Sequence, residues 1–443
     1  GGEVNSTERS AALHTALRVN SNTMKFKPPY LEEIEREKKK LEKLSKKITN
    51  NELKGYSGEK ISNIVNIGIG GSDLGSKLGV GALYQFSNPD LNVHFISNVD
   101  GISLNRLLTR LDPKKTIFII CSKSFSTIET LKNASVAKDW FNDLEGKEAF
   151  VKHFFGVSSN LGLMKSFGIS EDKCFSVWDW VGGRYSISSS IALSMILAIG
   201  WPNFEKFLFG MNSMDNHFLD APFKENLPVI LALIGIWNRN FLKISSHAIL
   251  PYDQNLEHLP NYLQQLEMES NGKSIRNNGE PVECSTSPLV WGGLASNAQH
   301  SFFQFLFQGS DKVSMDFFLP SQVGEAEDEQ YHLTLSSCIS QILAISKGNL
   351  EDKVNPHNIC SGSFPNSLIV YDEITPETLG ALIALYEHKV FVQATIWDIN
   401  PFDQWGVQLG KNISKDMPRD LSSEDFSKFS NYISEEIKYF KNK

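Results

Sequence analysis

The sequence predicts an α/β protein built on doubly wound parallel sheets, and three observations support this class. Short apolar segments alternate with helical patterns along most of the 443 residues. The clearest segment, residues 116–120, is a run of mainly branched apolar side chains, as expected of a strand buried on both faces. Glycine-rich and serine-rich loops follow the strands, where ligands bind in such sheets. A chain of this length exceeds one simple core, so we expect two domains.

The composition is that of an ordinary globular protein, with 41% hydrophobic and 21% charged residues. The net charge of −8 is spread along the chain, which argues against nucleic acids and anionic membranes as partners. Five cysteines without a CxxC pair indicate a reducing, cytoplasmic compartment, and no segment is apolar enough to span a bilayer. The ten histidines show no metal-ligand spacing, so we expect no metal site.

In the first half, a helical pattern over 7–17 and a long amphipathic helix over 31–48 come before the strands. We then expect five strands, at residues 63–69, 93–97, 116–120, 154–158 and 174–177. A strongly apolar helix over 186–200 closes this half of the chain.

Residues 201–203, Trp-Pro-Asn, interrupt the apolar pattern and predict a domain boundary. Beyond them, strands at 246–250, 313–319 and 367–371 alternate with helices at 228–242, 256–269, 299–308, 330–345 and 377–387. The predicted parts are an N-terminal segment over 1–26 that belongs to a helical region, α/β domains over 27–200 and 201–411, and a helical tail over 412–443.

The loop CSKSFSTIET, residues 121–130, joins the strand at 116–120 to a helix. The hydroxyl side chains at 122, 124, 126 and 127, together with Lys123, stand at a helix N-terminus, which offers free N–H groups and a partial positive charge. This combination suits a phosphate dianion. The alternative is an ordinary helix cap, since serine and threonine are preferred caps.

Two further loops contain closely spaced glycines. Residues 68–75, GIGGSDLG, match neither the dinucleotide fingerprint nor the P-loop, but three glycines allow a ligand to approach the backbone. In DWVGGRYS, Arg184 follows two glycines and is placed to face an anion or a developing oxyanion. A tight turn and a structural arginine are the respective alternatives.

The segment YLQQLEMESNGK, residues 262–273, predicts a helix with a candidate base. Gln265 and Glu269 are four residues apart and share one face, whereas Glu267 and Glu269 point to different sides. Only one of these glutamates can face a cleft, and a partly buried Glu269 would serve as a general base. The alternative is an exposed helical glutamate.

Two histidine- and lysine-containing segments complete the candidates. His300 stands at the start of an aromatic-rich helix and is a candidate acid/base, although a structural core histidine is the alternative. Gln404 and Lys411 are seven residues apart, or two helical turns, and would share one helix face. A surface lysine is the alternative there.

Taken together and in this order, these segments are similar to sequences of the phosphoglucose isomerase (glucose-6-phosphate isomerase) family. The matching segments are NIGIGGSDLG, CSKSFSTIET, DWVGGRYSISSSIA, YLQQLEMESNGK, NAQHSFFQFLFQG and DQWGVQLGK. The resemblance extends from Glu3 to Lys411 and implies two sugar-isomerase (SIS) domains, each with a five-stranded parallel sheet. It also implies a cytoplasmic homodimer that isomerises glucose 6-phosphate and fructose 6-phosphate reversibly through a cis-enediolate, in glycolysis and gluconeogenesis.

The resemblance implies a role for each matching residue. Glu269 matches the base that moves a proton between C1 and C2, and Arg184 matches the cation that stabilises the enediolate. His300 and Lys411 match the residues that open the sugar ring, and Glu129 matches the carboxylate that orients the histidine, which the partner subunit contributes in the family. The substrate-binding positions are Gly71, Ser72, Ser122, Lys123, Ser124, Thr127, Gly183, Gln265 and Gln404, of which Ser72 and the residues from Ser122 to Thr127 hold the phosphate.

The chain departs from the family pattern in three places. Ser124 replaces a commoner threonine but keeps the hydroxyl, and Ala394-Thr395 stand where glycine and an apolar residue are more frequent. The chain opens Gly-Gly-Glu-Val, where relatives already have a helical segment, so we expect that segment to be missing. Two alternatives to the isomerase stay open: a sugar-phosphate-binding SIS module without catalysis, and an isomerase that also accepts mannose 6-phosphate.

Overall fold

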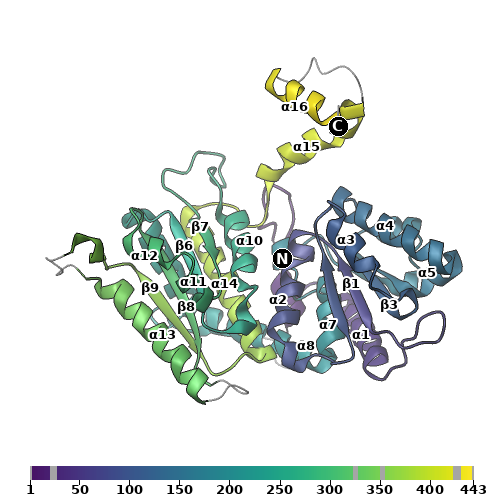
Figure 1. The fold of residues 1–443 in the computed structure, drawn as a ribbon, viewed down its shortest axis with the longest axis horizontal. Coiled ribbons are helices and arrows are strands. Elements are labelled where there is room, and N and C mark those ends of the chain that lie inside the picture. Colours follow the sequence, from purple (N-terminus) through teal and green to yellow (C-terminus); the bar gives the residue numbers. More distant parts are fainter. Residues whose placement is uncertain (1, 20–26, 323–327, 350–354, 423–430, 442–443) are drawn as a thin grey trace. The chain divides into compact units, whose positions relative to one another are not determined.

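The computed structural model describes residues 2–19, 27–322, 328–349, 355–422 and 431–441. The chain separates by its packing into two compact units, Gly1–Pro401 and Phe402–Lys443, and each is described by itself. The first unit contains two parallel sheets with helices around them, as Figure 1 shows.

The first sheet has five parallel strands, which confirms the sequence prediction. Its strands lie in the order β2-β1-β3-β4-β5. The chain therefore adds β2 on one side of β1, and then adds β3, β4 and β5 on the other side, so that the strand order reverses between β1 and β3. Ile67 at the end of β1 pairs with Ile120 of β3, which brings the loops after these two strands to one edge. The strands are β1 (Asn63–Ile67), β2 (Asn92–Ile96), β3 (Thr116–Cys121), β4 (Phe154–Ser158) and β5 (Cys174–Ser176).

Helices cover both faces of this sheet because its strands are apolar on both sides. One face packs against α3 (Ile102–Leu108), α4 (Ile128–Glu145), α5 (Lys147–His153) and α6 (Leu161–Phe167). On the other side are α1 (Leu31–Thr49) and α7 (Leu193–Ile199), with α2 (Leu74–Ala82) against α7. The buried cluster on the first face includes Phe118, Phe141 and Phe154.

The second sheet is also parallel and repeats the strand order of the first, β7-β6-β8-β9. Its strands are β6 (Ser246–Pro251), β7 (Leu289–Gly292), β8 (Val313–Pro320) and β9 (Asn366–Tyr371). The described residues thus give four strands where the family resemblance implied five. After β9 the chain enters the 22-residue helix α14 (Pro376–Trp397), which turns away to pack against other helices instead of returning to the sheet.

The remaining helices of the first unit fill the space around and between the sheets. Between the sheets, α14 packs along α8 (Trp201–Asp220), while α10 (Leu259–Asn271) contacts both α14 and α2 (Figure 1). The outer face of the second sheet packs against α11 (Ala295–Gln299), α12 (Phe303–Gln308) and α13 (Asp328–Lys347). The helix α9 (Leu227–Ile236) packs on α14 and continues into a π-helical turn at Trp237–Phe241.

Three helix predictions need correction. The helical pattern over 7–17 becomes only a short 3₁₀-helix, His14–Arg18, because the preceding residues form a tight bridge between Asn5 and Ser10. The predicted helix over 299–308 is broken into α11 and α12, so that His300 lies in the break. The predicted helix over 186–200 is α-helical only from Leu193, as α7, because two short 3₁₀ turns at Gly183–Tyr185 and Ser190–Ala192 come before it. In the second unit, the described part of the tail contains α15 (Gln408–Ser422) and α16 (Asn431–Lys441).

The predicted boundary at 200/201 falls between α7 and α8, and the domain limits themselves stay a prediction. Within the described ranges, no helix combines the length and the apolar character needed to cross a bilayer.

Candidate active site

The glycine loop after β1 meets two other loops at the edge of the first sheet. A Cβ atom built on Gly71 would lie 2.2 Å from the carbonyl oxygen of Gly183, so only glycine allows these two backbones to touch. At Gly68 a Cβ would lie 3.1 Å from the carbonyl oxygen of Cys121 at the end of β3. The three segments that the sequence singled out separately, with Ser72 in the first, therefore converge at one place.

The serine loop, residues 121–130, is held in shape by its own backbone and by neighbouring residues. Hydroxyls of Ser158 and Ser159 donate to the carbonyl oxygen of Lys123 at 2.8 and 3.0 Å, and Phe125 inserts its side chain into the core of the first sheet. Phe125 has φ of 49°, a conformation that is rare for a side chain of this size and is frequent at functional loops. The loop is therefore a constrained turn and not merely a helix cap.

The polar groups of the serine loop lie together. The hydroxyls of Ser122 and Thr127 are 3.3 Å apart, and the ammonium of Lys123 donates to the carbonyl oxygen of Asp179 at 2.9 Å. Ser124 is exposed and accepts a hydrogen bond from Ser126. Burial lowers the pKa of Lys123. A partly desolvated ammonium beside several hydroxyls is the arrangement that a phosphate dianion would favour.

Glu269 and Arg184 form the charged centre of the site. Nη1 of Arg184 lies 3.4 Å from Oε2 of Glu269, and Nε2 of Gln265 donates to the same oxygen at 3.1 Å. Within the described residues no hydrogen bond reaches Oε1. The side chain of Glu269 is 26% exposed, whereas that of Arg184 is 1% exposed. One carboxylate oxygen is thus fixed by the protein, and the other is the one that can meet a ligand.

The helix α10 links this centre to the glycine loop. A Cβ on Gly70 would lie 3.1 Å from Nε2 of Gln265, so the amide packs directly against that loop. The hydroxyl of Tyr262 donates to the carbonyl oxygen of Arg184 at 3.3 Å. At the end of the helix, Lys273 donates to the carbonyl oxygens of Glu269 and Ser270, which caps the last turn.

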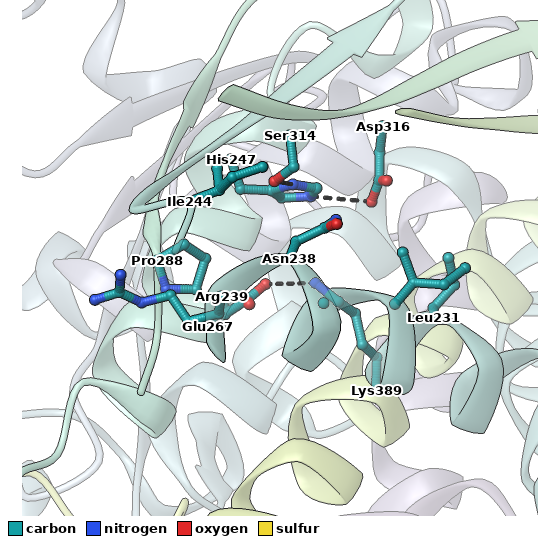
Figure 2. A pocket seen from close by; sticks show the side chains of 12 residues that line it. Leu231, Asn238, Arg239, Ile244, His247, Glu267, Pro288, Ser314, Asp316 and Lys389 are labelled. Atoms are coloured by element: carbon teal, nitrogen blue, oxygen red, sulfur yellow. Dashed lines mark hydrogen bonds and ion pairs between the residues drawn. The ribbon is translucent and has the colours of Figure 1, made fainter. Parts of the chain in front are cut away.

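The opposite face of α10 confirms that only one of its two central glutamates faces the site. Glu267 is buried, and its Oε2 pairs with Nζ of Lys389 on α14 at 2.7 Å (Figure 2). The cavity beside this pair has a volume of about 20 Å³, which is room for one water molecule and not for a sugar.

The same cavity is lined by a serine–histidine–aspartate group. His247 on β6 lies 2.9 Å from Ser314 and 3.1 Å from Asp316, both on β8, as Figure 2 shows. The distances are those of a nucleophile triad, but all three side chains are buried and no substrate fits beside them. We therefore assign this group to the packing of β6 against β8.

Among the described residues, no contact joins His300 to this centre. His300 is exposed at the end of α11, and no side-chain hydrogen bond or ion pair connects its ring to Glu269 or Glu129. Gln404 and Lys411 belong to the second unit. Their predicted common helix face is wrong, because Gln404 has an extended φ of −151° before a 3₁₀ turn and only Lys411 lies in α15.

Two parallel α/β halves, a hydroxyl-rich loop and a carboxylate paired with an arginine are the features expected of one class of protein, the sugar-phosphate isomerases of the SIS fold. A sequence profile for phosphoglucose isomerase matches residues 1–434. The chain belongs to the phosphoglucose isomerase family, and it is an aldose–ketose isomerase.

Individual relatives agree with this assignment. The chain is 47% identical over 422 residues to glucose-6-phosphate isomerase 1 of Chromohalobacter salexigens, covering 94% of this chain and 76% of the relative. It is 46% identical over 436 residues to glucose-6-phosphate isomerase of Burkholderia lata, with 96% and 80% covered. The crystal structure of a glucose-6-phosphate isomerase from Chlamydia trachomatis superposes with a TM-score of 0.85 at 30% identity, covering 97% of this chain and 81% of the other.

Proposed function

We propose that this site interconverts glucose 6-phosphate and fructose 6-phosphate, with Glu269 as the base and Arg184 as its electrostatic partner. The observation that carries the proposal is the geometry of Glu269: Arg184 and Gln265 hold one of its oxygens, and no hydrogen bond from the described residues reaches the other. The isomerisation moves a proton between adjacent carbons of the open-chain sugar. A fixed carboxylate that keeps one free oxygen suits this task.

In the proposed mechanism, Oε1 of Glu269 removes the proton from C2 of the open-chain aldose. Negative charge then develops on the sugar oxygens, and the guanidinium of Arg184 stabilises the resulting enediolate. Glu269 returns the proton to C1, and the hydroxyl proton moves from O2 to O1, so that the carbonyl group forms at C2 and the product is the ketose. No step requires a metal or an organic cofactor.

The serine loop has a separate role in this scheme. We assign the phosphate to Ser122, Lys123, Ser124 and Thr127, assisted by the backbone near Gly71, Ser72 and Gly183. Their contacts do not reach the reacting carbons. They would hold the open chain over Glu269, so that affinity at one end of the substrate is used to orient the other.

The ring-opening groups complete the proposal. His300 is exposed, and no contact among the described residues joins its ring to Glu269 or Glu129, which is compatible with a contribution to the site of a second subunit in a homodimer. Glu129 would orient His300 across that interface. For Lys411 and Gln404 we propose the roles that the family resemblance implies, ring opening and an amide contact with the substrate. We propose a cytoplasmic location from the cysteine pattern of the chain.

The Glu269→Gln substitution tests the base assignment. We expect exchange of the C2 proton with solvent to be lost and kcat to fall by about 10³-fold or more, with substrate binding largely unchanged. Glu257→Gln, an exposed glutamate near the start of the same helix, is the matched control and should keep wild-type rates. A Glu269→Gln enzyme with normal kcat would remove the basis of the mechanism.

Mixing two inactive variants tests the shared site. Glu269→Gln and His300→Ala homodimers each carry one defect in every site. If His300 crosses the interface, a mixed dimer has one site with both defects and one with neither, so activity returns after the subunits are exchanged. Absence of recovery, with mixed dimers shown by mass spectrometry, would place His300 and Glu269 of one chain in the same site.

A further inference from the structure

The guanidinium of Arg184 is held by a closed ring of hydrogen bonds on the side away from Glu269. Nε of Arg184 donates to the hydroxyl of Ser270 at 2.6 Å, and the hydroxyls of Ser270 and Tyr185 are 2.9 Å apart. The hydroxyl of Tyr185 lies 3.5 Å from the carbonyl oxygen of Pro401, which also accepts from Nη2 of Arg184. Ser270, Tyr185 and Arg184 are 0%, 1% and 2% exposed.

The hydrogen bonds of this ring allow one assignment of donors and acceptors. The carbonyl oxygen of Pro401 can only accept, so the Tyr185 hydroxyl donates to it. Ser270 accepts from Arg184 and therefore uses its own proton toward the Tyr185 oxygen. The ring of His14 stacks on that of Tyr185 at 4.7 Å between centroids, which restricts the phenol further.

This arrangement fixes the plane of the guanidinium. Nε and Nη2 form one edge of the group, and both are bonded to the protein scaffold. Nη1 is then directed at Oε2 of Glu269 at 3.4 Å. Rotation of the guanidinium away from Glu269 would break two buried hydrogen bonds, which is costly in a buried site.

Ser270 also follows Glu269 directly in α10. The same helical turn therefore carries the base and the hydroxyl that holds Arg184, and the spacing of the two charged groups is set by backbone geometry. We propose that Ser270 and Tyr185 are positioning residues, which orient Arg184 toward Glu269 and toward the charge of the enediolate. This inference rests on the role proposed above for Arg184.

Ser270→Ala tests the inference most directly. We expect kcat to fall about tenfold or more while KM changes less than about threefold, because the transition state depends on orientation more than the ground state does. Affinity for a phosphorylated hydroxamate, a planar anionic analogue of the enediolate, should fall by the same factor as kcat/KM. If Ser270 had only a structural role, Ser270→Ala would lower the thermal midpoint, but the loss of hydroxamate affinity would not equal the loss of kcat/KM.

Tyr185→Phe gives a second, independent measurement. It removes one oxygen and leaves the ring stacked on His14, so a smaller loss of kcat in the same direction is expected. The double variant Ser270→Ala with Tyr185→Phe should show a loss of kcat no larger than about that of the more damaging single variant, because either substitution alone already breaks the hydrogen-bonded ring. If Ser270→Ala does not fold, the hydroxamate comparison is made with Tyr185→Phe.

Matched controls use buried groups away from the site. Ser194→Ala removes a buried hydroxyl on α7 that has no hydrogen-bond partner among the residues that the structure describes, and Tyr386→Phe removes one that donates to Asp316. Both controls should keep wild-type kcat. Rates for Ser270→Ala and Tyr185→Phe within twofold of these controls would overturn the inference.

Arg184→Lys separates the two proposals. Lysine keeps the charge but loses the planar fork, so kcat should fall by at least as much as in Ser270→Ala. Full activity of Arg184→Lys would refute the role of Arg184 itself. Loss of activity in Arg184→Lys beside normal activity in Ser270→Ala would refute only the positioning ring.

Discussion

Removing the ammonium of Lys389 should destabilise the protein severely, because Glu267 would remain buried without a counter-charge. The two side chains are each 3% exposed and lie 2.7 Å apart, and Oε1 of Glu267 already has no partner in the described residues. In Lys389→Met neither carboxylate oxygen would be bonded. Breaking one partner of such a pair costs about 3–5 kcal/mol. A loss of that size is a large fraction of the ~5–15 kcal/mol that stabilises a typical protein.

The assay is urea unfolding followed by the intrinsic fluorescence of the eight tryptophans. Lys165→Met is a matched control, because Lys165 and Glu171 also lie 2.7 Å apart but have side chains that are 44% and 73% exposed. Its unfolding midpoint should be unchanged, since water already solvates both charges.

Replacing both partners distinguishes a buried charge from a lost contact. The free energy of unfolding of the double variant Glu267→Leu with Lys389→Met should be within about 1 kcal/mol of the wild-type value or above it, because neither buried charge is then present. If Lys389→Met unfolds at the same urea concentration as Lys165→Met, or if the double variant is no better than the single one, the reasoning is refuted.

Three other substitutions test local features. Gly71→Ala places a Cβ 2.2 Å from a main-chain oxygen, so it should destabilise the protein by about 1–3 kcal/mol and lower kcat, whereas Gly293→Ala meets no atom within 4 Å and should not change the thermal midpoint. Lys123→Ala should raise KM for the sugar phosphate about tenfold or more with a smaller loss of kcat, while the exposed Lys43→Ala leaves steady-state kinetics unchanged. Although burial alone would raise it, neighbouring arginine and histidine side chains hold the pKa of Asp215 at about 2. Because this pKa lies below the value in the unfolded chain, ionised Asp215 adds about 2 kcal/mol of stability above roughly pH 4, and this stability is lost as the pH falls toward 2. Urea unfolding measured across this pH range should show the loss in the wild type and not in Asp215→Asn.

The strands that are long and apolar could be predicted from the sequence. Residues 116–120 appear as β3 with one residue added, and the loops that follow β1 and β3 are where the periodicity placed them. The strand β7 was missed because Leu289–Gly292 has only four residues, too few to show a period of two. The break before α12 was also missed, since residues 299–308 contain no glycine or proline to signal it.

The charged and polar residues of the candidate site were easier to predict from the sequence than the buried contacts that hold them in place. Gln265 and Glu269 share a helix face through their spacing alone, and the structure confirms this pairing. The hydrogen bond between Tyr185 and Ser270 joins positions 85 residues apart, and the pair of Glu267 with Lys389 joins positions 122 residues apart. Such contacts depend on how the helices pack, and no local pattern in the sequence encodes them.

The two faces of α10 have a consequence for how the protein opens in solution. Glu269 looks outward, while Glu267, Ser270 and Asn271 are bonded to the interior of the same short helix. The backbone amides of this helix should therefore exchange with deuterium only through global unfolding, whereas amides of the serine loop exchange through local opening. The base would then lie on a slowly exchanging helix. The substrate phosphate would be bound by a loop whose amides exchange faster than those of the helix.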